Sequence, residues 1–462
     1  MRLKRFAQRW HRPLSLCIAL PVLLWSLSGL LHPMMAHWFK PSIPHRSITP
    51  PPINTDKPIL APAKAFWQHK ELHQLKLISN QDELIYLGIE PNQSQHFYNA
   101  HTGKRLPEFH LEYAEALAQY FLDDSSSPLL AIERIDSFEP TYGYINRFLP
   151  VYRVRLDRPD RLEVLVDLRT ASLASYDDSF RRFALLCFDL FHRWSFLGDR
   201  NSWVRISAIL LVSILSLAAA ITGLIKLISQ KKSVRAREAK KWHRSLGWLS
   251  LPLYFMFTLS GIYHVSAKYT PDDSPLWSSS QAIAVDQLTQ PISTNPGPIL
   301  ALSLAQIQGE SFYRIIRQND HRTPSFESTY SNSPSKIQDQ TYAIELACEF
   351  SGYLPEAVKR VELIESFRKD YGFIFKRLPV WRVHFDQQEY WHYTVDTEDS
   401  HMAMRLKPAS LIESLSFIYL HKLHFLDPIS PTLRHYMSAI SVSLLCSLIL
   451  SGLLLSRKRS SQ

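Results

Sequence analysis

Two pairs of histidines stand at the same spacing in two apolar stretches of the chain. His11 lies in a Trp-His-Arg triplet, and His32 ends the sequence Ser-Gly-Leu-Leu-His after an apolar run. His243 and His264 repeat this arrangement 232 positions later. The two members of each pair are 21 positions apart. On an α-helix this spacing is ~31 Å, about the thickness of a bilayer's hydrocarbon core.

Histidine is costly inside a membrane and is the commonest metal ligand in proteins. Matched histidines on matched helices therefore suggest haem held between helices, with neutral imidazoles as axial ligands. Twenty-one residues at 100° each return to within about 60° of the starting direction, so both histidines of a pair point to roughly one side. Gly29 and Gly261 precede the second histidine of each pair by three positions. They would admit a neighbouring helix or a flat macrocycle.

A second set of matches lies at an offset of 229 residues. His192 matches His421, Arg205 matches Arg434, and Gly223 matches Gly452. The haem-iron ligand candidates are thus six histidines: His11, His32, His192, His243, His264 and His421. They can pair within a half, as His32 with His192, or across halves, as His11 with His243. The arginines are candidate partners of haem propionates, or alternatively snorkelling residues at the membrane interface.

The elements that must position these residues are spanning helices. The chain has 462 residues, 46% of them hydrophobic, but a slightly negative mean hydropathy. It is therefore expected to be part membrane and part water-soluble. The apolar stretches long enough to span lie at 14–37, 203–228, 245–268 and 433–455.

Basic residues mark the cytoplasmic side. Together, the segment before the first span, the stretch from Lys226 at the end of the second span to Arg244, and the segment after the fourth span hold 16 Lys and Arg residues and one acidic residue, Glu238. The positive-inside rule places both termini and this middle loop in the cytoplasm. The rest of the chain is weakly acidic, so nucleic acid is not an expected partner. The two long connections are therefore expected to lie outside the cytoplasm.

Each long connection reads as a small α+β domain. Strands are expected at 83–89, 151–157, 161–168, 380–385 and 390–396, and helices at 109–122 and 341–350. Amphipathic helices at 180–196 and 411–425 would lie at the outer membrane surface. The expected fold is thus an α-helical membrane bundle of four spans plus α+β extracytoplasmic domains, built as two tandem parallel repeats.

The expected domains follow this order. They are a cytoplasmic tail with span 1 (1–38), a first periplasmic domain (39–179), an interfacial helix with span 2 (180–228), a basic loop (229–244), span 3 (245–268), a second periplasmic domain (269–409), and an interfacial helix, span 4 and tail (410–462).

The chain resembles the PepSY-associated transmembrane proteins, often called iron-regulated membrane proteins, over nearly its whole length. The Trp-His-Arg starts, the Ser-Gly-x-x-His span ends, and the strand pairs before Asp167 and Asp396 carry the resemblance, together with the turn at 99–104. Asn99 stands where the family has an acidic residue, and the turns after Asp167 and Asp396 lack its Thr-Gly pair. The resemblance implies PepSY-like outer domains, b-type haems within the helices, and electron transfer from cytoplasm to periplasm, as in ferric-siderophore reductases.

The leading hypothesis is an oxidoreductase that passes electrons across the membrane to reduce a ferric siderophore or other ferric chelate. No CxxCH motif occurs, so any haem is expected to be non-covalent. The resemblance implies b-type haem, of which two are expected, and a bacterial inner membrane as the location. No GxGxxG fingerprint occurs either, so the electron donor is a cytoplasmic or membrane partner. The alternative is a non-enzymatic, membrane-anchored binding module for a periplasmic partner or siderophore. A transporter with protonatable histidines is disfavoured because no acidic residue lies well inside a span.

The other histidines and the cysteines are not expected to bind haem or to form a disulfide. His424 and His435 have no histidine at the matching place in the first half and are expected to be structural or substrate-facing. The histidines of the soluble segments, including those from His69 to His110, are expected to be mostly surface residues. A disulfide between Cys187 and Cys348 is not favoured because the two cysteines occupy unmatched places.

Overall fold

The computed structural model describes residues 2–47, 52–53, 57–80, 83–199, 201–229, 238–267, 277–292, 297–318, 323–331, 334–368, 370–372, 375–386 and 392–460. Some expected features lie outside these residues. They are residues 230–237 of the basic loop at 229–244, the start of the strand at 390–396, and the last residue of the span at 245–268.

The chain folds into two compact units. The first, here called the helical unit, comprises Met1–Pro41, Ser179–Asp273 and Ala409–Gln462. The second, here called the sheet unit, comprises Ser42–Asp178 and Ser274–Pro408. Each unit is therefore assembled from segments that are far apart in the sequence.

Four long apolar helices form the helical unit. They are α1 (Arg2–Pro33, continued by the π-helical turn η1, Met34–Trp38), α5 (Trp203–Ser229), α6 (Glu238–Ser266) and α9 (Pro431–Ser460). All four are long and apolar enough to cross a membrane, in agreement with the predicted spans. The protein is therefore a multi-pass membrane protein.

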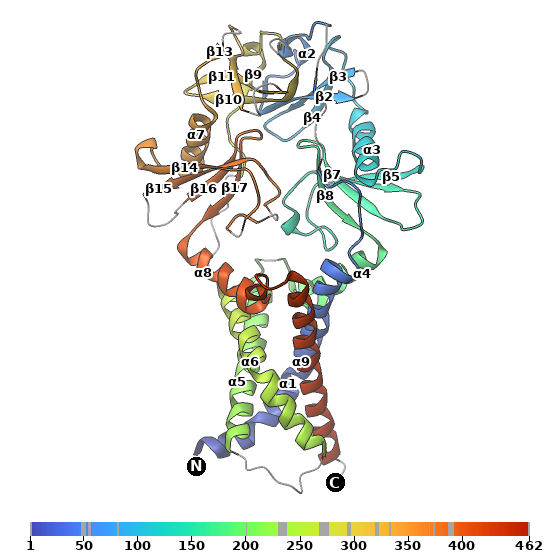
Figure 1. Cartoon of the computed structure of the whole chain (residues 1–462), viewed down its shortest axis with the longest axis vertical. Helices are drawn as coiled ribbons and strands as arrows, with labels where there is room; N and C mark the ends of the chain where they lie inside the picture. The colour runs from blue at the N-terminus through green and yellow to red at the C-terminus, as the bar shows by residue number, and fades with distance from the viewer. Residues whose placement is uncertain are drawn as a thin grey trace. The chain divides into compact units, whose positions relative to one another are not determined.

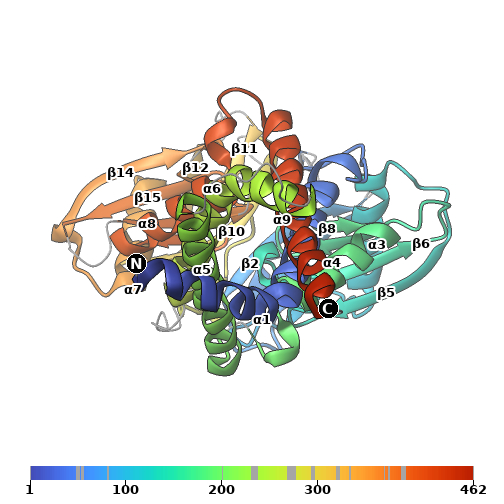
Figure 2. The same ribbon diagram turned by 90° about the horizontal axis from the view of Figure 1, so that it is seen from below.

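The four helices lie side by side (Figures 1 and 2). Helix α1 packs against α5 and α9, and α6 packs against the same two helices. Their shared core includes Ile18, Val22, Leu251, Tyr254 and Leu445. Figure 1 shows that α1 begins and α9 ends at the same end of this bundle. Helices α1 and α6 both begin at this end, which we call the N-terminal level. We call the opposite end of the bundle the C-terminal level.

Short helices complete the helical unit at the C-terminal level. They are α4 (Ser179–Phe191), η3 (Ser195–Leu197), α8 (Pro408–Ser416), the π-helical turn η9 (Phe417–His421) and η10 (His424–Leu426). Helix α4 packs against α1, and η9 packs against α6. The predicted amphipathic helices at 180–196 and 411–425 are therefore present, each broken into a helix and a following turn.

The sheet unit contains antiparallel sheets only among its described residues. One sheet has the order β2 (Gln74–Asn80), β3 (Glu83–Ile89), β4 (Gln95–Asn99). The next has the order β5 (Leu129–Ile135), β6 (Val151–Leu156), β7 (Glu163–Asp167), β8 (Ser172–Asp177).

We call the two parts of the sheet unit, Ser42–Asp178 and Ser274–Pro408, the first and second outer segments. The second outer segment forms two further sheets. Their orders are β10 (Ile299–Ile307), β11 (Glu310–Arg317), β12 (Pro324–Ser328), β13 (Pro334–Ser335), and β14 (Val358–Ile364), β15 (Val380–Phe385), β16 (His392–Asp396), β17 (His401–Leu406). The short strands β1 (Glu71–Leu72) and β9 (Ile283–Ala284) pair the two segments with each other.

One helix covers each four-stranded sheet that ends an outer segment. Helix α3 (Phe109–Leu122) contacts β5, β6 and β7, and α7 (Asp339–Ser351) contacts β14 to β17. Further helical turns of this unit are α2 (Pro62–Ala65), η2 (Tyr144–Asn146), η5 (Val285–Gln287) and η7 (Pro355–Ala357). The expected α+β character, with a helix on an antiparallel sheet, is thus confirmed.

The two outer segments also share a core. One cluster of buried side chains combines Leu75 and Tyr86 of the first segment with Leu302 and Tyr313 of the second. Burial of apolar surface contributes roughly 25 cal/mol per Å² to stability, so this shared core joins the segments into one unit. All four cysteines are free, including Cys187 and Cys348.

Candidate functional site

His192 follows the end of α4, and its ring packs against α1. Its Nδ1 is 3.2 Å from the Trp25 carbonyl oxygen and 3.3 Å from the Ser28 hydroxyl. The ring stacks on Phe188, with centroids 4.5 Å apart and planes 14° from parallel. A Cβ added at Gly29 would lie 3.5 Å from Cε1 of the imidazole. Gly29 therefore leaves room for this ring against the helix backbone.

His421, the last residue of η9, is held against α6 in the same manner. Its Nδ1 is 3.3 Å from the Ser260 hydroxyl, and its ring stacks on Phe417 with centroids 4.8 Å apart. A Cβ added at Gly261 would lie 4.0 Å from Cε1 of the ring. Phe417 and His421 are the first and last residues of a π-helical turn, a feature often found at functional sites.

These two imidazoles contact each other. The ring centroids of His192 and His421 are 6.4 Å apart, with planes at 77°. Burial lowers the pKa of His192 to about 4. Burial, with nearby His192 and His264, lowers the pKa of His421 to about 3. Both rings are therefore neutral near pH 7, which is the form that binds metals.

His264 and His32, at the ends of α6 and α1, differ in their surroundings. The ring of His264 stacks on Phe417 with centroids 4.1 Å apart, and its Nδ1 bonds the Glu413 carboxylate. His32 is exposed. The residue 229 positions before Glu413 is Ala184, which has no carboxylate. Among the described residues, no carboxylate pairs with His32, whereas Glu413 pairs with His264.

At the N-terminal level, His11 and His243 each face a glycine of a neighbouring helix. A Cβ added at Gly223 of α5 would lie 3.0 Å from Cε1 of His11. A Cβ added at Gly452 of α9 would lie 3.2 Å from Cε1 of His243. Nδ1 of His243 is also 2.9 Å from the Ser451 hydroxyl. Both imidazoles are therefore held in contact with the backbone of the next helix.

The partners of Nδ1 decide which ring nitrogen carries the proton. A carbonyl oxygen only accepts, so Nδ1 of His11 donates to Ala219 and Nδ1 of His192 donates to Trp25. The serine partners of His421 and His243 already donate their own protons to helix carbonyls. Their oxygens consequently accept from these rings.

Five of the six predicted ligands thus have Nδ1 held and Nε2 left with its lone pair. Within the described part of the chain, Nε2 of none of these five rings has a hydrogen-bond partner. Metal-ligating histidines almost always donate their second ring N–H to a carboxylate, carbonyl or similar acceptor. The donor set therefore fits haem iron, with Nε2 as the ligand atom.

Sequence reasoning identified the histidines but not the residues that orient them. Those residues are Ser28, Ser260, Phe188, Phe417 and Glu413. The two serines had a signal, since each stands directly before the glycine of a Ser-Gly-x-x-His block.

Comparison with known proteins identifies the family of this chain. The family model described as the PepSY-associated TM region matches residues 8–459. The chain belongs to this family. The family assignment made from the sequence is therefore confirmed, and the match includes all six histidines. Neither curated proteins nor solved structures gave a match.

In this PepSY-associated protein, Arg434 belongs to a polar cluster at the C-terminal level. Its Nε is 3.0 Å from Asp427 Oδ1, and its Nη1 contacts the ring of His424. The other carboxylate oxygen of Asp427 is 2.7 Å from Nδ1 of His424. Next to this cluster, His435 stacks on His37 with centroids 4.8 Å apart. Arg434 has a carboxylate partner of its own, and its role toward a propionate stays a prediction.

Within the described part of the chain, Arg205 forms no ion pair with a carboxylate and instead binds backbone carbonyls. Its side chain is 6% exposed, its Nε donates to the Arg193 carbonyl at 2.6 Å, and its Nη1 donates to the Gly198 carbonyl at 3.4 Å. These bonds hold the turn between α4 and α5, which follows His192. The geometry favours a positioning role over contact with a propionate.

We therefore expect Arg205→Met to lower stability without lowering haem content. Loss of charged hydrogen bonds to two carbonyls should cost about 1–3 kcal/mol. Thermal unfolding in detergent and the haem-to-protein ratio of the same preparation measure the two effects. A fall in haem content at unchanged stability would instead support the propionate assignment.

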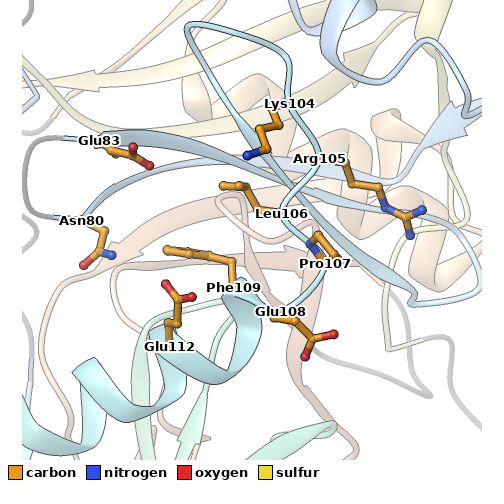
Figure 3. Close-up of a pocket in the computed structure, with 9 residues that line it drawn as sticks. All are labelled: Asn80, Glu83, Lys104, Arg105, Leu106, Pro107, Glu108, Phe109 and Glu112. Atoms are coloured by element: carbon orange, nitrogen blue, oxygen red, sulfur yellow. The ribbon is translucent and has the colours of Figure 1, made fainter.

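The sheet unit has an open cavity of about 430 Å³ between the β2–β4 sheet and the start of α3. Figure 3 shows Lys104 and Glu112 pointing towards the same hollow, whereas Arg105 and Glu108 point away from it. The lining mixes both charges, and none of the six histidines contributes to it. This cavity is therefore separate from the histidine site.

Proposed function

We propose that the protein is a haem-containing oxidoreductase of a bacterial inner membrane. It passes electrons from a cytoplasmic or membrane donor to a ferric siderophore or other ferric chelate in the periplasm. The termini lie in the cytoplasm, the outer domains in the periplasm, and the two halves are tandem parallel repeats. The observation that carries the proposal is the set of five imidazoles with Nδ1 anchored and Nε2 free.

The histidines would hold haem at both levels of the bundle. His11 and His243 are the candidates at the N-terminal level, and His32, His192, His264 and His421 at the C-terminal level. Bound haem supplies a one-electron redox centre, and bis-histidine ligation suits electron transfer because no iron position stays open for oxygen.

The chain's own residues have three tasks in this function. The Trp25 carbonyl and the Ser28 hydroxyl keep the His192 tautomer that presents Nε2, and the Ser260 hydroxyl does the same for His421. Phe188 and Phe417 fix the ring planes by stacking. The apolar helices exclude water from the space between the levels. Reduction releases iron because Fe(II) is softer than Fe(III) and fits hard-oxygen chelators poorly.

The colour and reactivity of the purified full-length protein test this proposal. The expected preparation is red, with a Soret band that shifts on addition of dithionite. The reduced protein, freed of dithionite, should reoxidise on addition of a ferric chelate and yield one Fe(II) per electron, trapped by ferrozine. A colourless protein from haem-replete cells would refute the redox function and favour the membrane-anchored binding module.

Ser28→Ala and Ser260→Ala should each weaken haem retention. Both changes remove a hydroxyl at Nδ1 of a ligand, and changes to such orienting partners typically cost 10–100-fold in metal affinity. We expect about tenfold faster transfer of haem to apomyoglobin. Ser266→Ala is the matched control on α6, because the Ser266 hydroxyl donates to the Tyr263 carbonyl. Equal transfer rates in all variants would contradict the positioning role.

A further inference from the structure

Three potential metal ligands meet at the β3–β4 hairpin of the sheet unit. Glu90 directly follows β3, His96 lies in β4, and His69 lies just before β1. Ile89 pairs with Gln95 across the hairpin, and the Glu90 N–H donates to the Ser94 carbonyl at 3.0 Å. This register brings Glu90 beside His96. Sequence reasoning expected these histidines to be surface residues, but they face a common carboxylate.

The two imidazoles approach the two oxygens of that carboxylate. Nδ1 of His69 is 2.9 Å from Oε1 of Glu90, and Nε2 of His96 is 3.3 Å from Oε2. One ligand atom from each of the three side chains lies within 4.8 Å of the others. The ring centroids of the two histidines are 4.4 Å apart. Two nitrogens and a carboxylate therefore converge on one small volume.

Tyr98 orients the first imidazole from behind. Its hydroxyl is 2.8 Å from Nε2 of His69, and its ring packs at right angles to the imidazole at 5.8 Å. Tyr98 is itself buried, with 3% of its surface exposed. If Nε2–H donates to this hydroxyl, the lone pair of Nδ1 faces Glu90. This is the outer-partner arrangement of metal-bound histidines.

We propose that His69, Glu90 and His96 bind one divalent transition-metal ion of the zinc class. The two nitrogen–oxygen distances of 2.9 and 3.3 Å end on different oxygens of Glu90, so the carboxylate would bind the ion through both oxygens. With metal–ligand bonds of ~2.1 Å, these distances correspond to nitrogen–metal–oxygen angles of about 90° and about 105°. Both angles suit a coordination sphere completed by water. Two imidazoles and one carboxylate favour Zn²⁺, Ni²⁺ or Fe²⁺ over Mg²⁺ and Ca²⁺, which prefer oxygen.

The site is reachable from solvent. The side chains of His69, His96 and Glu90 are 10%, 16% and 24% exposed. It lies in the sheet unit, whereas the six predicted haem ligands lie in the helical unit. The proposal therefore does not rest on the proposed redox function, and neither depends on the outcome of the other.

Zinc titration of the tag-free, full-length protein tests the site. We expect Glu90→Gln and His96→Gln each to bind one zinc fewer per chain than wild type, measured by equilibrium dialysis and metal analysis in millimolar Mg²⁺. Tyr98→Phe should retain the site with about tenfold weaker affinity. His101→Gln is the matched control, because His101 lies in the turn that follows β4 and its Nδ1 faces the Pro58 carbonyl. Equal zinc counts in wild type and the ligand variants would overturn the proposal.

A second measurement uses wild-type protein and so does not depend on whether a variant folds. Diethylpyrocarbonate labelling, read by mass spectrometry, reports the reactivity of each histidine. Zinc should protect His69 and His96 about tenfold and leave His101 and His110 unchanged. Equal labelling of His69 and His96 with and without zinc would refute a metal site there.

Discussion

Replacing His192 or His421 by alanine is expected to remove about half or more of the bound haem. Each ring presents Nε2 while Nδ1 is held by a serine hydroxyl on a long helix. With two haems expected, loss of one axial ligand should release one haem or leave it five-coordinate. The pyridine haemochrome assay measures haem per chain, and the reduced spectrum reports the change in ligation.

His424→Ala is the matched control for this prediction. His424 lies three positions after His421, but its ring nitrogens face Asp427 and Arg434, so no lone pair is left for a metal. Haem content should therefore be unchanged in this variant. Added imidazole should restore the spectrum of the His192 and His421 variants if the lost group was a ligand. Normal haem content with an unchanged reduced spectrum in both variants would refute their assignment.

Much of the fold could be predicted because its signals are local. The helix expected at 109–122 and the strands expected at 83–89 and 380–385 have these bounds in the structure. Apolar length, alternation and turn residues carry this information over a few neighbouring positions. The membrane-spanning helices could be predicted for the same reason, because a bilayer requires long apolar helices whatever the tertiary contacts are.

The partners of the histidines could not be predicted, because they come from distant segments. Ser28 and His192 are 164 positions apart. His264 has Glu413 as a partner, while the matching place for His32 is Ala184. Spacing within a helix says where a ring points, but not which hydroxyl or carboxylate will face it. The tautomers that make these rings suitable ligands were visible only in the folded chain.

The ion pairs between the two outer segments also could not be predicted from the sequence. Lys76 of the first outer segment is 3.0 Å from Oδ1 of Asp399 in the second. Arg169 of the first segment is 3.4 Å from the other oxygen of this carboxylate. Sequence matching paired the outer segments as separate copies, whereas these ion pairs and the shared apolar core join them.

Arg377→Met is expected to destabilise the sheet unit by about 3–5 kcal/mol, because it leaves buried carboxylates short of a partner. Nη1 of Arg377 is 2.7 Å from Asp396 Oδ2 and 2.8 Å from Asp399 Oδ2. The Arg377 side chain is 5% exposed and that of Asp399 is 1% exposed. Hydrogen exchange of β15 and β16 in the full-length protein measures the opening free energy of this region.

The destabilisation caused by Arg377→Met should become smaller as the pH falls. Burial would raise the pKa of Asp399, but Lys76, Arg169 and Arg377 hold it well below its usual range. A carboxyl group with a lowered pKa contributes stability above its unfolded pKa of about 3.9, and this contribution is lost as the pH falls further. The difference between wild type and Arg377→Met should therefore be full at pH 7 and shrink in acid below about pH 4.

Arg360→Met separates the effect of burial from that of lost charge. Arg360 also pairs with a carboxylate of the same unit, Glu362, at 3.0 Å, but its side chain is 69% exposed. Exposed ion pairs contribute about 0–1 kcal/mol because water screens both charges. This control should therefore barely change exchange in β15 and β16. Similar small effects for both arginines would show that the buried carboxylates find other partners when Arg377 is removed.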